Sequence, residues 1–164
     1  MAEEKKVVVI ASDGSDHAKL ALQKYATEFY KPGDFAVVVY VATYTEISYG
    51  SVALIPGDPA LVQRIVESEE IKCTEVVKKL SKELVDLKIE GEVVRVNGEP
   101  GPAILEKAKD LKAVYIVVGS RGLGKIRRTI MGSVSDYLVH HAHIPVVVCK
   151  SEHHHHHHGG DSHS

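Results

Sequence analysis

Short apolar runs alternate with amphipathic stretches along most of the chain. Runs of strand length, nearly all apolar, are typical of strands buried on both faces of a parallel sheet. They predict strands over residues 6–11, 35–42, 89–96, 113–118 and 144–149, of which the third alternates with polar residues and is expected in a more exposed position. Between them, apolar residues at helical spacing predict helices over about 18–29, 61–87, 102–111 and 133–141.

The order of these elements predicts an α/β fold with a single doubly wound, five-stranded parallel sheet and helices on both of its faces. The natural strand order for such a chain is 3-2-1-4-5. In sheets of this type ligands bind beyond the carboxyl ends of the strands, where the strand order reverses. Asp13-Gly14-Ser15 and Gly119-Ser120-Arg121-Gly122 should therefore emerge side by side, after the first and fourth strands.

A glycine-rich loop follows the fourth strand and leads into the last predicted helix. Gly119 and Gly122 are followed, after nine residues, by Gly132-Ser133. Glycines allow the backbone to approach a ligand closely and to adopt positive φ, and the free N–H groups at a helix N-terminus bind anions. Ser133 and Ser135 add hydroxyl groups, and Ser133 is also a candidate cap of the helix. The pattern predicts a site for a nucleotide phosphate.

Two other phosphate-binding motifs fit the sequence less well. Gly119, Gly124 and Lys125 nearly match a Walker A loop, but Ile126 replaces the serine or threonine that would hold Mg²⁺. The turn after the first strand lacks the G-x-G-x-x-G pattern of dinucleotide-binding proteins. The basic residues Lys125, Arg127 and Arg128 are either solvated surface or a source of charge for the outer phosphates.

Composition narrows the class of protein further. Residues 151–164 are interpreted as a purification tag, which carries seven of the eleven histidines, and residues 1–150 as one nucleotide-binding domain. Without the tag the acidic and basic residues balance, which argues against nucleic-acid and membrane-surface binders. The apolar runs are too short to span a bilayer, no signal peptide is visible, and isolated cysteines fit a reducing cytoplasm.

The remaining chemically active residues suggest no catalytic or metal centre. His140, His141 and His143 are expected near the C-terminus of the last helix, where cationic side chains are favourable. Cys73 and Cys149 are expected to be buried packing residues. No serine, histidine and acid combination stands out, and no general base is identified, so a binding protein is favoured over an efficient enzyme.

Four motifs in order resemble the ATP-binding branch of the universal stress protein family. They are the pattern G-x2-G-x9-G-[ST] at Gly119, Gly122, Gly132 and Ser133, the segment Ala11-Ser-Asp-Gly-Ser15 after the first strand, Val96-Asn-Gly-Glu-Pro100 before the third helix, and the closing segment Ile144-Pro-Val-Val-Val148. The resemblance covers roughly residues 5–150, which is nearly the whole chain outside the tag.

The resemblance implies a set of site residues. Asp13 would lie at the adenosine end, Ala11 and Ser12 near the base, and Val41 would meet the adenine through its backbone. Val118 would line the base pocket, and Gly119 and Gly122, with Arg121 between them, would approach the ribose and phosphates. The phosphates would be held by Gly132, Ser133, Val134 and Ser135.

The same resemblance implies a cytoplasmic stress-response regulator or sensor that binds ATP, or AMP or ADP, with or without Mg²⁺ or Mn²⁺. It also implies a homodimer joined through the C-terminal strand Ile144–Cys149. Two alternatives stay open: a slow ATPase or autophosphorylating enzyme, and a dimeric adaptor without bound nucleotide.

Overall fold

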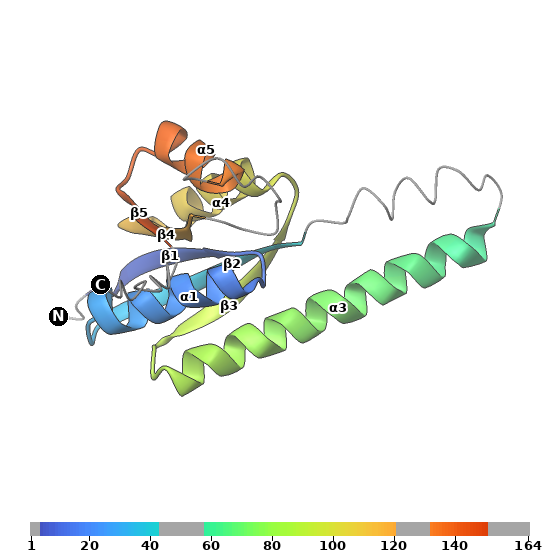
Figure 1. Ribbon diagram of the computed structural model, residues 1–164, viewed down its shortest axis with the longest axis horizontal. Helices are drawn as coiled ribbons and strands as arrows, with labels where there is room; N and C mark the ends of the chain where they lie inside the picture. The colour runs from blue at the N-terminus through green and yellow to red at the C-terminus, as the bar shows by residue number, and fades with distance from the viewer. Residues whose placement is uncertain (1–3, 43–57, 121–131, 151–164) are drawn as a thin grey trace, which may run out of the picture.

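The computed structural model describes residues 4–42, 58–120 and 132–150, and these residues form a parallel sheet covered by helices on both faces (Figure 1). In chain order the elements are β1 (Lys6–Ser12), α1 (Asp16–Lys24), η1 (Tyr25–Phe29), β2 (Asp34–Ala42), α3 (Pro59–Asp86), β3 (Gly91–Asn97), α4 (Pro100–Asp110), β4 (Tyr115–Gly119), α5 (Ser133–His141) and β5 (Val146–Cys149). The sheet order is β3-β2-β1-β4-β5, which confirms the predicted fold class and topology.

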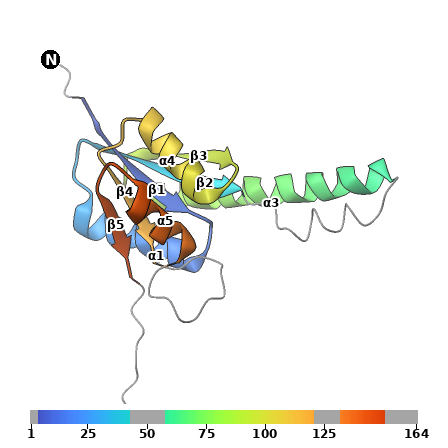
Figure 2. The same ribbon diagram turned by 90° about the horizontal axis from the view of Figure 1, so that it is seen from above.

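Two apolar layers hold the helices to the sheet. On one face, alternate residues of the strands pack against Leu22 and Tyr25 of α1 and η1 and against Leu80 and Leu84 of α3. On the other face, the intervening strand residues pack against α4 and α5, with Leu138 fully buried. This two-sided burial explains why the central strands are continuous apolar runs. Figure 2 shows α4 and α5 together over one face.

The third and fourth strands begin two residues later than their sequences predict. Lys88 and Lys112 lie at positive φ, 55° and 52°, directly after α3 and α4. The amides of the next residues, Ile89 and Ala113, donate to carbonyls near the ends of those helices, over 3.0 and 2.9 Å. These bonds form the helix C-terminal motif in which one left-handed residue closes the last turn. Ile89 and Ala113 therefore complete helix ends instead of starting strands.

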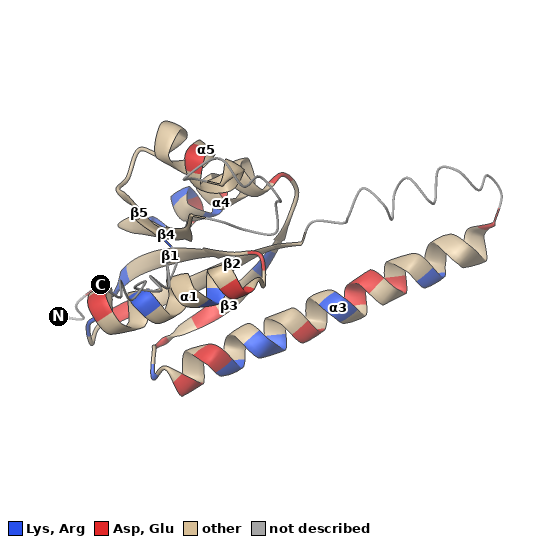
Figure 3. Cartoon of the chain, viewed as in Figure 1, with Lys and Arg blue, Asp and Glu red and all other residues tan. Residues whose placement is uncertain are grey.

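The helix α3 is continuous through its polar middle and extends far beyond the sheet. Its C-terminal half packs on the core through Cys73, Leu80 and Leu84. Arg95 of β3 donates two hydrogen bonds of 2.7 Å to the carboxylate of Glu70 at the middle of the helix. The N-terminal half runs past the carboxyl ends of the strands (Figure 1), and residues of both charges alternate along its length (Figure 3). Within the described ranges, no helix combines the length and apolar character that crossing a bilayer requires.

Candidate functional site

The pairing of β1 with β4 stops short of their carboxyl ends, where the strand order reverses, and this unpaired region is here called the gap. The two strands pair only as far as Ile10 and Val117, although β1 continues to Ser12 and β4 to Gly119. On its other side β1 remains paired with β2 up to Ser12. The last residues of β1 and β4 are therefore neighbours without being joined by the ladder. This is the position at which doubly wound sheets bind their ligands.

The turn after β1 is fixed by side-chain hydrogen bonds to its own backbone. The Ser12 hydroxyl accepts from the Gly14 amide at 3.1 Å, and the Asp13 carboxylate accepts from the Ser15 amide at 2.9 Å. Ser15 caps α1 by accepting from the Ala18 amide at 3.3 Å. Gly14 has φ +79°, which a side chain would strain. The Asp13 carboxylate is thus held in one orientation at the edge of the gap.

The N-terminus of α5 lies at the end of β4, held there by a backbone hydrogen bond. Gly132 is the N-cap residue, and its amide donates to the carbonyl of Ser120, the residue after β4. Ser133, expected as a candidate cap, is instead the first residue of the helix. Gly132 has φ −71°, which every residue type adopts, so its glycine is not required for a positive φ.

Ser133 and Ser135 differ in their availability to a ligand. The Ser133 side chain is exposed. Ser135 is 1% exposed, and its hydroxyl donates to the Gly132 carbonyl at 2.9 Å. As at every helix N-terminus, the amides of the first turn have no partner within the helix. Since the Gly132 amide is already bonded, the amides of residues 133–135 remain to face an anion.

Three of the four residues expected near the base, all except Ser12, lie together on the α4 and α5 side of the sheet. Ala11, Val41 and Val118 belong to one buried cluster, against which Val134 of α5 packs. Each of the three is 4–5% exposed. β2 extends two residues beyond the end of β1 while it stays paired with β3 up to Ala42. The backbone of Val41 consequently passes the end of β1, beside the gap.

Two expected contributors, Arg121 and Gly122, fall outside the described residues. The basic residues Lys125, Arg127 and Arg128, for which surface and phosphate-binding roles stay open, fall outside them too. Within the part of the chain that is described, no group of three metal-ligating side chains comes together. His140 and His141 lie in the last turn of α5, as predicted, and their Nδ1 atoms contact the carbonyls of Asp136 and Tyr137 at 2.8 and 2.9 Å.

Ser120, the residue after β4, is bonded to both β5 and α5, and the motif analysis gave it no role. It is 4% exposed, its amide donates to the Cys149 carbonyl at 2.9 Å, and its carbonyl accepts from Gly132. It therefore ties β5 and α5 to the end of β4. The only sequence signal for this role is its position between the strand and the loop glycines.

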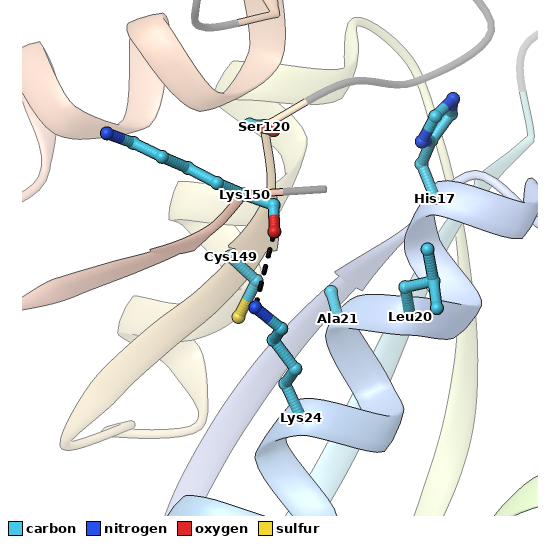
Figure 4. A pocket seen from close by; sticks show the side chains of 7 residues that line it. All are labelled: His17, Leu20, Ala21, Lys24, Ser120, Cys149 and Lys150. Atoms are coloured by element: carbon cyan, nitrogen blue, oxygen red, sulfur yellow. Dashed lines mark hydrogen bonds between the residues drawn. The ribbon is translucent and has the colours of Figure 1, made fainter. Parts of the chain in front are cut away.

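A small cleft beside Ser120 contains the second cysteine. Figure 4 shows the Lys24 ammonium next to the Cys149 sulfur, and Lys24 donates to the Lys150 carbonyl at 3.3 Å. Burial raises the pKa of the Cys149 thiol, and the Lys24 charge opposes that effect. A buried, protonated thiol is a poor nucleophile. Cys149 is therefore a packing residue, as expected, and so is the buried Cys73.

Comparison with known proteins identifies the family. The model of the universal stress protein family matches residues 5–150. A universal stress protein of Methanocaldococcus jannaschii is 32% identical over 145 residues, covering 88% of this chain and 82% of the relative.

Solved structures have the same fold. The universal stress protein UspA of Lactobacillus plantarum gives a TM-score of 0.71 at 19% identity, over 89% of this chain and 98% of that one. An Arabidopsis thaliana family member with AMP bound gives 0.63 at 20% identity, over 90% and 92%. An Archaeoglobus fulgidus universal stress protein in complex with dAMP gives 0.62 at 24%, over 89% and 98%. The match along residues 5–150 and the M. jannaschii relative show that this chain belongs to the universal stress protein family.

Proposed function

We propose that this protein binds an adenine nucleotide at the carboxyl ends of β1 and β4 and serves as a sensor or regulator in the stress response. ATP is the leading ligand, and AMP and ADP are the alternatives. The observation that carries the proposal is the N-terminus of α5, whose cap Gly132 is fixed to Ser120 beside the gap between the two strands. A helix N-terminus at a switch point combines a dipole and free amides for phosphate groups.

The other end of the gap suits the nucleoside. The Asp13 carboxylate, an acceptor held by the Ser15 amide, matches the donor hydroxyls of a ribose. The backbone of Val41 lies beyond β1 and suits the edge of a base. Two structurally similar family members were solved with AMP and dAMP, which supports an adenine nucleotide. A divalent cation on the phosphates would find oxygen ligands in Asp13 and Ser133.

The edge strand β5 supports a homodimer. β5 is the last strand of the sheet, and the carbonyls of Pro145 and Cys149 point towards β4, where they accept hydrogen bonds. Because the direction alternates along a strand, the backbone groups of Val146 and Val148 point outwards. An edge of this kind pairs readily with a second copy of the same strand. We propose that the dimer forms along Ile144–Cys149.

The first experiment is calorimetry of ATP binding by Gly132→Val. The backbone of Gly132 is extended, so valine fits its conformation, but the branched side chain would occupy the space of a phosphate. We expect at least about a tenfold loss of affinity, or roughly 1.4 kcal/mol, with a native circular dichroism spectrum. Val139→Ala, at an exposed position of the same helix, is the matched control. Unchanged affinity in Gly132→Val would contradict the proposal.

A second pair of variants distinguishes a side chain that contacts the phosphate from one that stabilises the start of α5. Ser133→Ala should weaken ATP binding and leave the free energy of unfolding unchanged, since its side chain is exposed. Ser135→Ala should lower the free energy of unfolding by about 1 kcal/mol, since it loses a buried hydrogen bond. The opposite pattern would mean that the phosphate lies elsewhere.

Two measurements separate the alternatives. Nucleotide recovered from the denatured, purified protein distinguishes a nucleotide-binding protein from an adaptor with an empty site. Single-turnover ATP hydrolysis, with Mg²⁺ and with Mn²⁺, distinguishes a binder from an enzyme. We expect turnover far below the ~1–100 s⁻¹ of kinases. A rate of about one per second that collapses in Asp13→Ala, with affinity unchanged, would make Asp13 catalytic.

A further inference from the structure

A second pocket lies at the end of the sheet opposite the candidate nucleotide site. It is formed by the starts of β1, β4 and β5 and by the segment from the end of η1 to the start of β2. Its volume is about 420 Å³, within the range of about 300–1,000 Å³ that is usual for small-molecule sites. Its lining comprises Lys6, Val8, Glu28, Phe29, Lys31, Asp34, Val114, Tyr115, Pro145 and Val147.

The floor of this pocket, here called the amino-end pocket, is apolar. Val8, Tyr115 and Val147 come from three adjacent strands and lie on the face that α1 and η1 cover elsewhere. Phe29 of η1 forms a wall, and Val114 is 41% exposed at the rim. Tyr115 and Val147 are half-buried and Val8 is fully buried, so the helices leave the part of this apolar sheet surface around Tyr115 and Val147 accessible. An apolar cavity with a few polar groups at one end is the usual form of a small-molecule site.

Behind the floor lies a buried hydroxyl without a hydrogen-bond partner among the described residues. Tyr25 is 0% exposed, and its hydroxyl is unpartnered. Leaving a buried hydroxyl unsatisfied is unfavourable. Burial is the main cause that raises the pKa of Tyr25, and the nearby Tyr115 and Asp34 raise it further. Burial, and after it Asp34, also raises the pKa of Tyr115. Two neutral phenols therefore lie near the Asp34 carboxylate, and Tyr115 and Asp34 both line the pocket.

Charge and burial at this end favour a cation. Asp34 is half-buried, and its carboxylate is oriented by a hydrogen bond of 3.2 Å from the Lys31 amide. Lys6 and Lys31 are exposed, and such side chains lay their stems along apolar surface while their ammonium groups remain in water. The faces of Phe29 and Tyr115 also attract cations. A carboxylate ligand would instead face Asp34 and Glu28.

We propose that the amino-end pocket binds a small organic ammonium ion whose aromatic or aliphatic body lies on Val114, Tyr115 and Val147. The ammonium group lies against the Asp34 carboxylate, and the body displaces water from the apolar floor. This site is separate from the nucleotide site and does not depend on the proposed function.

The test uses two probes that share a phenyl ring and differ in charge. The ¹⁵N-labelled full chain is titrated with 2-phenylethylamine and, separately, with 3-phenylpropanoate, and amide shifts are followed by NMR. The amine should give saturable shifts centred on the starts of β4 and β5, with a dissociation constant in the low millimolar range. These shifts should be the same with and without ATP. A carboxylate that binds as tightly as the amine, or amine shifts that do not saturate or lie elsewhere, would overturn the proposal.

Variants then test the polar end. Asp34→Asn should weaken amine binding about tenfold. The control is Asp110→Asn, the same substitution at an exposed position at the end of α4, which should leave amine binding unchanged. Tyr25→Phe removes the unpartnered hydroxyl behind the floor, which does not line the pocket, so amine binding should stay unchanged and the protein should stay at least as stable in urea. If Asp34→Asn binds the amine like the wild type, the assignment of the polar end is wrong.

Discussion

Gly101 is the position where a single methyl group should disturb the packing of α4 on α5. A Cβ atom at Gly101 would lie 2.7 Å from Cγ and 3.1 Å from Cε1 of the Tyr137 ring. Carbon atoms in contact are normally about 3.5–4.0 Å apart, so the ring or the helix must move. The ring also stacks on His141, with centroids 4.1 Å apart and planes inclined by 17°. Gly101→Ala should therefore displace the Tyr137 ring or α5, the helix that begins at Ser133.

The expected cost follows from two opposing contributions. Overpacking of this kind costs about 1–3 kcal/mol, whereas alanine in place of glycine in a helix gains at most about 1 kcal/mol. Gly101→Ala should therefore lower the free energy of unfolding by up to about 2 kcal/mol. Each kcal/mol lowers Tm by about 2–4 °C in a domain of this size. The assay is urea unfolding at equilibrium.

A double-mutant cycle isolates the contact between Gly101 and Tyr137. In the Tyr137→Ala background the added methyl group meets no ring, so Gly101→Ala should be neutral or slightly stabilising. The coupling between the two positions should be about 1–3 kcal/mol. A Gly101→Ala substitution with the same effect on the free energy of unfolding in both backgrounds would refute this reasoning.

Three further outcomes follow from the backbone and from tyrosine burial. Val148→Pro removes an outward-facing amide and should yield monomers in sedimentation if the dimer forms along β5, whereas Val147→Pro should unfold the edge because its amide faces β4. Lys88→Gly removes the strain of a lysine in the left-handed conformation and should raise the free energy of urea unfolding by about 0.5–1 kcal/mol. Lys78→Gly, the control within α3, should lower it by about 1 kcal/mol. Burial raises the pKa of Tyr40 to about 12, above the value near 10 in unfolded chains. The neutral phenol therefore favours the fold, stability should decline as pH rises from about 10 to 12, and Tyr40→Phe should reduce that decline in alkaline titrations.

The topology was predictable because it rests on a pattern repeated along the whole chain. Apolar strands alternate with amphipathic helices, and that alternation leaves few arrangements for a parallel sheet. The starts of β3 and β4 were not predictable, because lysine occupies the left-handed position at which glycine would have marked the helix end. The sequence before β3 and β4 therefore gave no stop signal, and the apolar residues Ile89 and Ala113 were assigned to strands.

The motif located the candidate phosphate site but did not predict how its atoms are used. The spacing from Gly119 to Gly132 and Ser133 indicates a loop and a helix N-terminus, and the structure places that helix N-terminus at the end of β4, beside the gap between β1 and β4. Motifs record which residues occur, and hydrogen bonding decides which of their atoms remain available. Here the Ser120 carbonyl occupies the Gly132 amide, and Gly132 in turn occupies the Ser135 hydroxyl.

Within one turn of α5, the polar groups that fix the helix start differ from those that remain available to a ligand. Gly132 and Ser135 both use polar groups to fix the start of the helix against β4, where Ser120 also holds β5. Two polar side chains of that turn are exposed next to the amides that an anion would meet, Ser133 and Asp136. The negative charge of Asp136 opposes an anion, which leaves Ser133 as the side chain that can bind one. Binding at this end should therefore rest mainly on backbone amides, which keep the same geometry whichever phosphate is present. A site of that kind distinguishes nucleotides poorly by phosphate number, so selection among ATP, ADP and AMP must come from groups further along the phosphate chain.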